Sequence, residues 1–278
     1  MKLSSTFTLF VSSLVFFASV VGSAQIELVH APVIKPSDRV LVEIVGGDDA
    51  NEGEVPFIAS LQLVGGEPFC GASLIRPNWV LTAAHCVTDW YKKNKIVVGA
   101  YNQKELTNAE TFTALKVITH PSYREINKDY DFALIKLSAN STVTPVELNS
   151  EEIDIEGAAE PILATVAGWG VLGETSIKKP DILQKVELPL VSQIQCNDIL
   201  AYNKRITDRM MCAGFKTGDK DSCSGDSGGP LFIQSEGRPL LIGVVSWGKG
   251  CARAYKYGVY AKVSSQLEWI NKQIELYP

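Results

Sequence analysis

The stretch Gly225-Asp226-Ser227-Gly228-Gly229-Pro230 is the densest run of turn-forming residues in the chain, and a single hydroxyl lies at its centre. Glycine has no side chain, so backbone amides can come close to whatever Ser227 contacts, as stabilisation of an oxyanion requires. Taken alone, the run also fits an ordinary glycine turn. It satisfies the pattern GxSxG, the nucleophile elbow of α/β-hydrolases, so that fold is the first alternative to test.

The positions of the histidines decide against the α/β-hydrolase alternative. Those enzymes place an acid and then a histidine after the serine, yet residues 228–278 contain neither histidine nor aspartate. A base for Ser227 must therefore lie upstream. His30 falls in a segment that we expect to be removed. His85 lies among small residues in the segment TAAHC, whereas His120 precedes a proline in a polar turn and is expected at the surface.

A carboxylate is needed as the third member of such a site. A neutral imidazole activates serine only where another group fixes its tautomer and stabilises its charged form. Asp131 precedes the apolar run 132–137, which is expected to be a strand that carries it into the interior. Asp129 lies beside Lys128 and is expected at the surface. The residues themselves therefore favour Ser227 with His85 and Asp131.

Short apolar runs separated by glycine, proline and polar residues recur from Ile44 onward. This pattern predicts many short strands and is typical of an all-β sandwich or barrel. The expected strands are 57–64, 73–75, 79–83, 95–99, 132–137, 162–167, 230–233 and 240–246. One long helix is expected at the C-terminus, where apolar residues recur at helical spacing over 267–274 after Ser264-Ser265, a pair that could cap it.

Three segments in a fixed order carry a resemblance to a known family. TAAHC at 82–86, DFALIKL at 131–137 and GDSGGP at 225–230 resemble the motifs of the chymotrypsin-like serine peptidases, trypsin among them, from Ile44 to the terminal helix. The resemblance implies an all-β fold of two six-stranded antiparallel β-barrels with a C-terminal α-helix. It also implies the family's triad mechanism, with Ser227 as nucleophile, His85 as base, Asp131 as orienting carboxylate, and the amides of Gly225 and Ser227 as oxyanion hole.

The chain contains six cysteines, an even number that favours disulfides in a protein bound for an oxidising compartment. Their number alone leaves the pairing open. A zinc site is the weaker alternative, because no CxxC pair occurs and histidine is scarce. The resemblance implies the pairs Cys70–Cys86, Cys196–Cys212 and Cys223–Cys251.

The resemblance also implies a specificity pocket between residues near Ser227 and a later glycine-rich segment. Its expected substrate-binding residues are Asp221, Ser222, Ser246, Trp247, Gly248 and Gly258. Gly248 and Gly258 would leave the pocket open to a long side chain. Asp221 matches the position that makes trypsin prefer Lys and Arg, because an uncharged substrate would leave this carboxylate buried and unpaired. Ser246-Trp247-Gly248 would pair with the substrate backbone as an added strand, and Asp219 is the better candidate for a surface acid.

The chain is expected to comprise a leader, a propeptide and one enzyme domain. Lys2 precedes an apolar run, and small residues stand before Ala24, so residues 1–24 are predicted to be a signal peptide of a secreted, extracellular protein. Residues 25–43 are predicted to be an activation propeptide, and 44–278 the peptidase domain. The first barrel would cover about 44–150, and the second barrel with the helix about 151–278, divided at the polar stretch 149–161.

Activation is expected to depend on a new amino terminus. In the family, cleavage before a sequence like that at Ile44 frees an amine that pairs with the aspartate preceding the nucleophile, here Asp226, and this ion pair orders the pocket. Glu43 departs from the Lys or Arg that precedes this bond in trypsinogen-like zymogens. We therefore expect an activating protease or trimming, not simple autocatalysis.

Three further positions bear on ligands and modification. Glu110 matches a calcium ligand of trypsin, but Ala100 stands where a carboxylate would be needed, so no metal or cofactor is predicted. Tyr257 replaces the proline typical of trypsin, and tyrosine accompanies a sodium site in related clotting proteases. Asn140-Ser141-Thr142 is an acceptor sequence for N-glycosylation at Asn140.

Composition narrows the classes of partner. The net charge is −5 without any long Lys/Arg cluster, which excludes a basic footprint for nucleic acid, and no later apolar run is long enough to span a membrane. We expect a monomer that acts on proteins or peptides containing Lys or Arg, with protein protease inhibitors as further candidate partners. The alternative is a peptidase-like binding or regulatory protein that keeps the fold without the chemistry.

Overall fold

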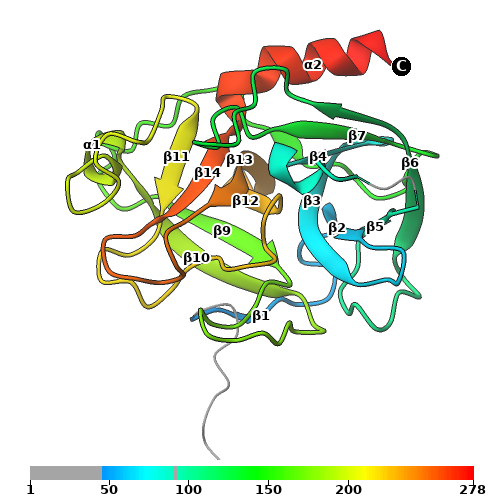
Figure 1. The fold of residues 1–278 in the computed structure, drawn as a ribbon, viewed down its shortest axis with the longest axis horizontal. Coiled ribbons are helices and arrows are strands. Elements are labelled where there is room, and N and C mark those ends of the chain that lie inside the picture. The colour runs from blue at the N-terminus through cyan, green and yellow to red at the C-terminus, as the bar shows by residue number, and fades with distance from the viewer. Residues whose placement is uncertain (1–45, 91–92) are drawn as a thin grey trace, which may run out of the picture. The chain divides into compact units, whose positions relative to one another are not determined.

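The computed structural model of this chain describes residues 46–90 and 93–278 (Figure 1). The expected signal peptide, the expected propeptide and Ile44 lie outside the described residues. The strands are β1 (Asp48–Asp49), β2 (Ile58–Gln62), β3 (Pro68–Arg76), β4 (Trp79–Thr82), β5 (Lys95–Val98), β6 (Glu110–Thr119), β7 (Ala133–Leu137), β8 (Glu147–Leu148), β9 (Leu163–Gly168), β10 (Gln184–Val191), β11 (Met210–Ala213), β12 (Pro230–Ser235), β13 (Arg238–Trp247) and β14 (Gly258–Lys262). The helices are α1 (Gln193–Cys196) and α2 (Leu267–Leu276), with 3-10 turns at Ala84–Cys86 and Val263–Gln266.

The first barrel closes in the order β2-β3-β4-β7-β6-β5, and all its strand pairs are antiparallel. Strand β2 pairs with both β3 and β5, which closes the ring. Every residue of β2 is buried, so both faces of this strand are covered by other parts of the protein. Burial of this kind, at roughly 25 cal/mol per Å² of apolar surface, is the main force that holds such a barrel together.

The second barrel closes through β9-β10-β11-β14-β13-β12 and back to β9, again with antiparallel neighbours. Strand β1 adds to the edge at β10, and β8 runs parallel to β13. The expectation of an all-β fold with two six-stranded barrels and a terminal helix is confirmed. Along the described part of the chain, no helix combines the length and the apolar character that crossing a bilayer needs.

Each end of the described chain contacts the barrel that is formed by the other half of the chain. Strand β1, near the N-terminal end, pairs with β10 of the second barrel. The C-terminal helix α2 instead contacts the first barrel, where Arg76 Nη2 donates to Asn271 Oδ1 at 3.2 Å. Between the barrels, the rings of Phe57 and Phe232 meet edge to face at 5.4 Å. These contacts fix one barrel against the other, and the candidate site lies where they meet.

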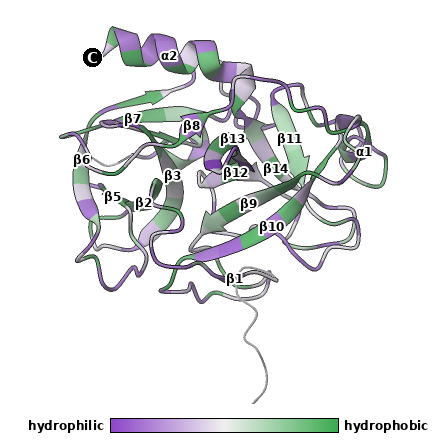
Figure 2. Cartoon of the chain, turned by 180° about the vertical axis from the view of Figure 1, so that it is seen from behind, coloured by the Kyte–Doolittle hydropathy of each residue, from purple (hydrophilic) through white to green (hydrophobic). Residues whose placement is uncertain are grey.

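Four barrel strands, β6, β10, β11 and β14, were not expected from the sequence. Strand β6 buries only Phe112 among its ten residues, so its composition is that of a polar surface. Strand β10 alternates apolar and polar residues and contains Pro189, which masks a strand pattern. Figure 2 shows this alternation of hydropathy along β10 and around α2. Their pairing depends on neighbours that are distant in sequence.

The terminal helix forms as expected, but its expected cap is wrong. Ser264 and Ser265 lie within the 3-10 turn Val263–Gln266, and the helix proper begins at Leu267 with no side-chain cap. The hydroxyl of Ser265 donates back to the carbonyl of Lys262 at 2.6 Å. A serine that bonds to a preceding carbonyl stabilises the turn that leads out of β14 and not the start of the helix.

Candidate active site

His85 and Asp131 are brought together by the pairing of β4 with β7. Thr82 lies opposite Ala133 in that ladder, so the turn after β4 carries His85 beside the residue that precedes β7. The Asp131 carboxylate is fully buried and accepts from the backbone amide of His85 at 3.0 Å. Its second oxygen lies 2.8 Å from His85 Nδ1. A carboxylate at Nδ1 favours the tautomer that leaves Nε2 free to take a proton.

Ser246 supplies a third hydrogen bond to this carboxylate. Its hydroxyl donates to Asp131 Oδ2 at 2.5 Å. The β13–β14 register shifts between Val245 and Trp247, so Ser246 lies at an irregularity of the kind that re-aims a side chain near active sites. The second barrel therefore contributes directly to holding Asp131, which belongs to the first.

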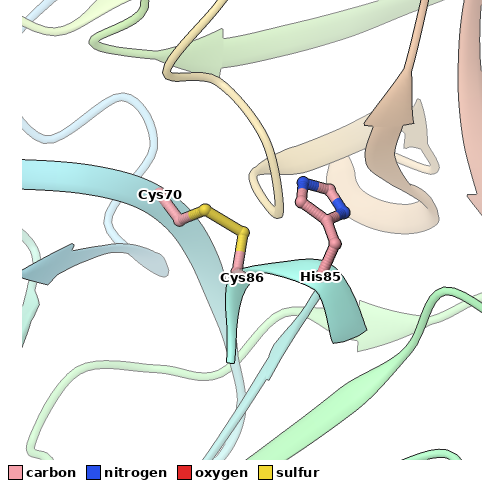
Figure 3. Close-up of side chains that lie close together, drawn as sticks. All are labelled: Cys70, His85 and Cys86. Carbon is pink, nitrogen blue, oxygen red and sulfur yellow. A yellow bond between two sulfur atoms is a disulfide. The ribbon is translucent and has the colours of Figure 1, made fainter. Parts of the chain in front are cut away.

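Figure 3 shows the imidazole of His85 beside the disulfide between Cys70 and Cys86. This bond joins β3 to the 3-10 turn Ala84–Cys86 and so holds the backbone of His85. The sulfur atoms and the imidazole are near enough to resemble a metal-ligating group, but sulfurs bonded to each other are not thiolate ligands. The other disulfides are Cys196–Cys212 and Cys223–Cys251, and all three pairs are those that the resemblance implies.

Ser227 projects from a glycine turn that is pressed against the first barrel. The amide of Gly71 donates to the carbonyl of Ser227 at 2.7 Å. A Cβ atom at Gly228 would lie 2.2 Å from Thr82 Oγ1 and 3.2 Å from Cys86 Sγ, and its φ is +80°. Only glycine permits this approach. Ser227 therefore lies next to the residue that follows His85, half-buried and within reach of solvent.

The Ser227 hydroxyl and His85 form no hydrogen bond among the contacts between described residues. Catalytic hydrogen bonds are often long in the free enzyme and tighten when substrate binds. The backbone amides of Gly225 and Ser227 likewise donate to no protein acceptor in the described part of the chain, whereas those of Asp226 and Gly228 donate to Cys223 and Val245. The amides of Gly225 and Ser227 are thus two donors without an acceptor among the described residues.

A cavity of about 370 Å³ opens beside Ser227. Its lining includes every residue that the sequence assigned to substrate binding, namely Asp221, Ser222, Ser246, Trp247, Gly248 and Gly258. A Cβ atom at Gly258 would lie 2.9 Å from Asp221 Oδ1 and 2.7 Å from Tyr260 Oη. Glycine at this position therefore leaves room in front of the carboxylate.

Asp221 is buried, with 3% of its surface exposed, while Asp219 is exposed as expected. The amide of Ala252 donates to Asp221 Oδ2 at 3.1 Å, and Oδ1 has no hydrogen-bond partner among the described residues. Burial raises the pKa of Asp221 to about 7, with a smaller contribution from Asp226, against hydrogen bonds that lower it. A buried carboxylate with a free oxygen is suited to a cationic ligand.

Asp226 is also buried, on the other side of the Ser227 turn. Its oxygens accept from the amides of Gly170 at 2.8 Å and Cys223 at 2.9 Å. Burial raises the pKa of Asp226 to about 6, opposed by the two hydrogen bonds and the charge of Lys179. A Cβ atom at Gly168 would lie 2.2 Å from Asp226 Oδ1. The two glycines therefore make room for a carboxylate that forms no ion pair with any described residue.

Two expectations about surface residues are wrong. His120 is buried between the rings of Tyr130 and Trp269, with centroids at 4.7 and 4.6 Å, and burial lowers its pKa. Asp129 is buried as well. Burial alone would raise the pKa of Asp129, but hydrogen bonds from Arg209 and Thr207 hold it below its usual value. The covering residues come from α2 and the second barrel, which the local sequence does not show.

The structure also shows the surroundings of the positions that bear on metal binding and glycosylation. Glu110 accepts hydrogen bonds from Ser141 and from the amide and hydroxyl of Thr142. Ala100 is buried, and its side chain offers no ligand atom. Asn140 is exposed. The carbonyl of Tyr257 accepts from Tyr202 Oη at 2.6 Å.

Comparison with known proteins gives a consistent result. The family model described as Trypsin matches residues 44–270. The chain is 42% identical to Trypsin-3 of Salmo salar over 247 residues, covering 87% of this chain and 95% of that protein. It is 41% identical to the anionic trypsin of Canis lupus familiaris (84% and 90% covered) and 40% identical to Trypsin 5G1 of Aedes aegypti (82% and 84% covered). The chain belongs to the trypsin family of serine endopeptidases.

Proposed function

We propose that this protein is a secreted endopeptidase that cleaves peptide bonds after Lys or Arg through an acyl-enzyme. The observation that carries the specificity is the buried carboxylate of Asp221 in the cavity beside Ser227, where Oδ1 has no hydrogen-bond partner among the described residues. A substrate ammonium or guanidinium would pair with this oxygen, whereas an apolar side chain would leave a buried charge unpaired.

The proposed chemistry uses two barrels that each supply part of the site. Ser227 Oγ attacks the substrate carbonyl while His85 Nε2 takes its proton, and Asp131 stabilises the resulting imidazolium. The negative oxygen of the tetrahedral intermediate accepts hydrogen bonds from the amides of Gly225 and Ser227. The proton on His85 passes to the leaving amine as the peptide bond breaks. Water then attacks the acyl ester by the same steps, releases the acid and restores Ser227.

The substrate backbone is proposed to add as an antiparallel strand to Ser246-Trp247-Gly248. This segment is the end of β13 and the residue after it, and all three residues line the cavity. Ser246 also bonds to Asp131. A peptide bound along this edge would therefore have its basic side chain in the cavity and its carbonyl beside Ser227.

We also propose that the enzyme is made as a zymogen. Residues 1–24 act as the signal peptide, 25–43 as the propeptide, and 44–278 as the peptidase, with barrels at about 44–150 and 151–278. The amine of Ile44, freed by cleavage after Glu43, pairs with Asp226. Asp226 is buried and forms no ion pair with any residue that the structure describes, which supports this proposal. A pocket selective for Lys and Arg does not accept Glu43, so a different protease makes the cut.

A covalent test separates this function from a non-catalytic binding role. Secreted protein is treated with a fluorophosphonate probe, and the labelled residue is found by mass spectrometry, with the Ser227→Ala variant as control. Labelling at Ser227 and hydrolysis of arginyl esters are expected in the native protein only. If the protein that begins at Ile44 neither reacts with the probe nor hydrolyses the ester, a peptidase-like binding protein is favoured instead.

A further inference from the structure

An exposed arginine lies against the wall of the cavity. The guanidinium of Arg205 is 5.6 Å from the centroid of the Trp247 ring, and Trp247 lines the cavity. The edge of Tyr202 supports the same indole, with ring centroids 4.8 Å apart. Arg205 therefore stands beside the segment to which the substrate backbone is proposed to add.

The loop that presents Arg205 is held in place by its own backbone. Asn203 and Lys204 both have positive φ angles, 47° and 62°. On the far side, Ile206 is bound twice by Asn197, whose Oδ1 accepts from its amide at 2.9 Å and whose Nδ2 donates to its carbonyl at 2.9 Å. Because the backbone is constrained before and after Arg205, the Arg205 side chain starts from a fixed position beside Trp247.

The charge of Arg205 is not neutralised within the described part of the chain, where it forms no ion pair. Asp129 in the first barrel is engaged by Arg209 and Thr207. Another cation reinforces the positive potential, because Lys256 Nζ lies 5.7 Å from the centroid of the Tyr202 ring. An exposed guanidinium stacked on an aromatic ring keeps its donors free for a carboxylate.

The direction of an added substrate strand leads it past this cation. With the scissile carbonyl at Ser227 and the strand antiparallel to Ser246-Trp247-Gly248, the residues before the basic side chain run along Trp247 and away from the cavity. We infer that Arg205 forms a second recognition site, which selects peptides with Asp or Glu two to four residues before the scissile Lys or Arg. This inference rests on the proposed function and extends it.

The test uses matched fluorogenic peptides that end in Arg. The reference peptide carries Ala at the four positions before Arg, and the others carry one Asp or one Lys at the second, third or fourth position before Arg. For native enzyme at low salt, kcat/KM is expected to be about twofold to fivefold higher for the best Asp peptide than for the Lys peptide at the same position, the range expected for an exposed ion pair. Raising the salt to about 1 M should largely remove this preference.

Two variants assign the preference to Arg205. Arg205→Met keeps an apolar stem on Trp247 and is expected to abolish the Asp preference, while Arg205→Glu reverses it. Lys204→Met, which removes a neighbouring exposed cation, serves as the control and should leave the preference unchanged. An Asp:Lys ratio that is unaltered in Arg205→Met overturns the inference. Failure to cleave even the Ala peptide would instead count against the proposed function.

Discussion

Arg209 in the second barrel donates two hydrogen bonds to Asp129 in the first, Nε to Oδ1 at 2.9 Å and Nη2 to Oδ2 at 2.8 Å. The guanidinium also lies 4.5 Å from the centroid of the Tyr130 ring. Lys128 and Tyr130 both have positive φ angles, 55° and 56°, so this segment is strained and depends on its surroundings. It leads directly to Asp131, the carboxylate beside His85.

Replacing Arg209 should therefore lower both the free energy of unfolding and kcat. Arg209→Met leaves a buried carboxylate unpaired and is expected to lower the free energy of unfolding by about 2 kcal/mol. kcat should fall more than KM changes, because Asp131 is displaced while the pocket is not. Urea unfolding and peptide kinetics provide the measurements. The control is Arg238→Met, which breaks an exposed pair with Glu147 and should change stability by less than about 1 kcal/mol.

The same ion pair predicts a dependence of stability on pH. Because the pKa of Asp129 is lowered in the folded protein, its contribution is fully present above the unfolded value of about 4 and is lost as pH falls through the folded value. The stability gap between the native protein and Arg209→Met should thus be constant near neutral pH and should shrink in acid. A gap that widens below pH 4 would contradict this account.

Ligand binding to the cavity should also depend on pH. The pKa of Asp221 is raised to about 7, so the carboxyl is mostly neutral at pH 6 and mostly ionised at pH 8. Benzamidine, an aromatic cation, is expected to bind about tenfold more tightly at pH 8 than at pH 6. Calorimetry on Ser227→Ala measures this without turnover. In Asp221→Ser, binding should be weak and flat with pH; a slope that persists there would place the titrating group elsewhere.

Replacement of Gly228 tests the close contact between the Ser227 turn and the first barrel. Gly228→Ala adds a Cβ atom 2.2 Å from Thr82 Oγ1 and is expected to destabilise the protein by more than about 3 kcal/mol and to abolish ester hydrolysis. Gly237→Ala is the matched control, because its φ of +76° is nearly the same but nothing lies within 4 Å. It should cost only about 1 kcal/mol, the price of the backbone conformation.

The proposed activation can be tested by cleaving the zymogen at the bond between Glu43 and Ile44. Cleavage after Glu43 by a Glu-specific endopeptidase is expected to raise arginyl esterase activity by at least about a hundredfold, because the new amine would neutralise Asp226 and order the pocket. The Asp226→Asn variant, cut at the same bond, should remain at zymogen level. Amino-terminal sequencing verifies the cut. Full activity of a form that begins at a residue other than Ile44 would refute the proposed pair.

The amino-acid sequence by itself determined the class of fold and named the main candidate residues of the site. Motifs around His85, Asp131 and Ser227 act locally: a small-residue turn, an aspartate before an apolar strand, and a glycine run each require little more than their neighbours. The family resemblance added Asp221, because it matches the position that makes trypsin prefer Lys and Arg. The family resemblance then implied how the cysteines pair, which their spacing alone left open.

Tertiary structure decided what depends on contact between distant segments. Strand β6 lacks a clear apolar pattern and Pro189 interrupts the alternation in β10, so these strands are recognised by the partners with which they pair. His120 and Asp129 look like surface residues in the sequence, yet α2 and Arg209 bury them. Burial is a property of what lies opposite a side chain, and here the opposite residues are about 80 to 150 positions away. Only folding brings such residues together, so local sequence could not show that Asp129 ties the two barrels beside Asp131.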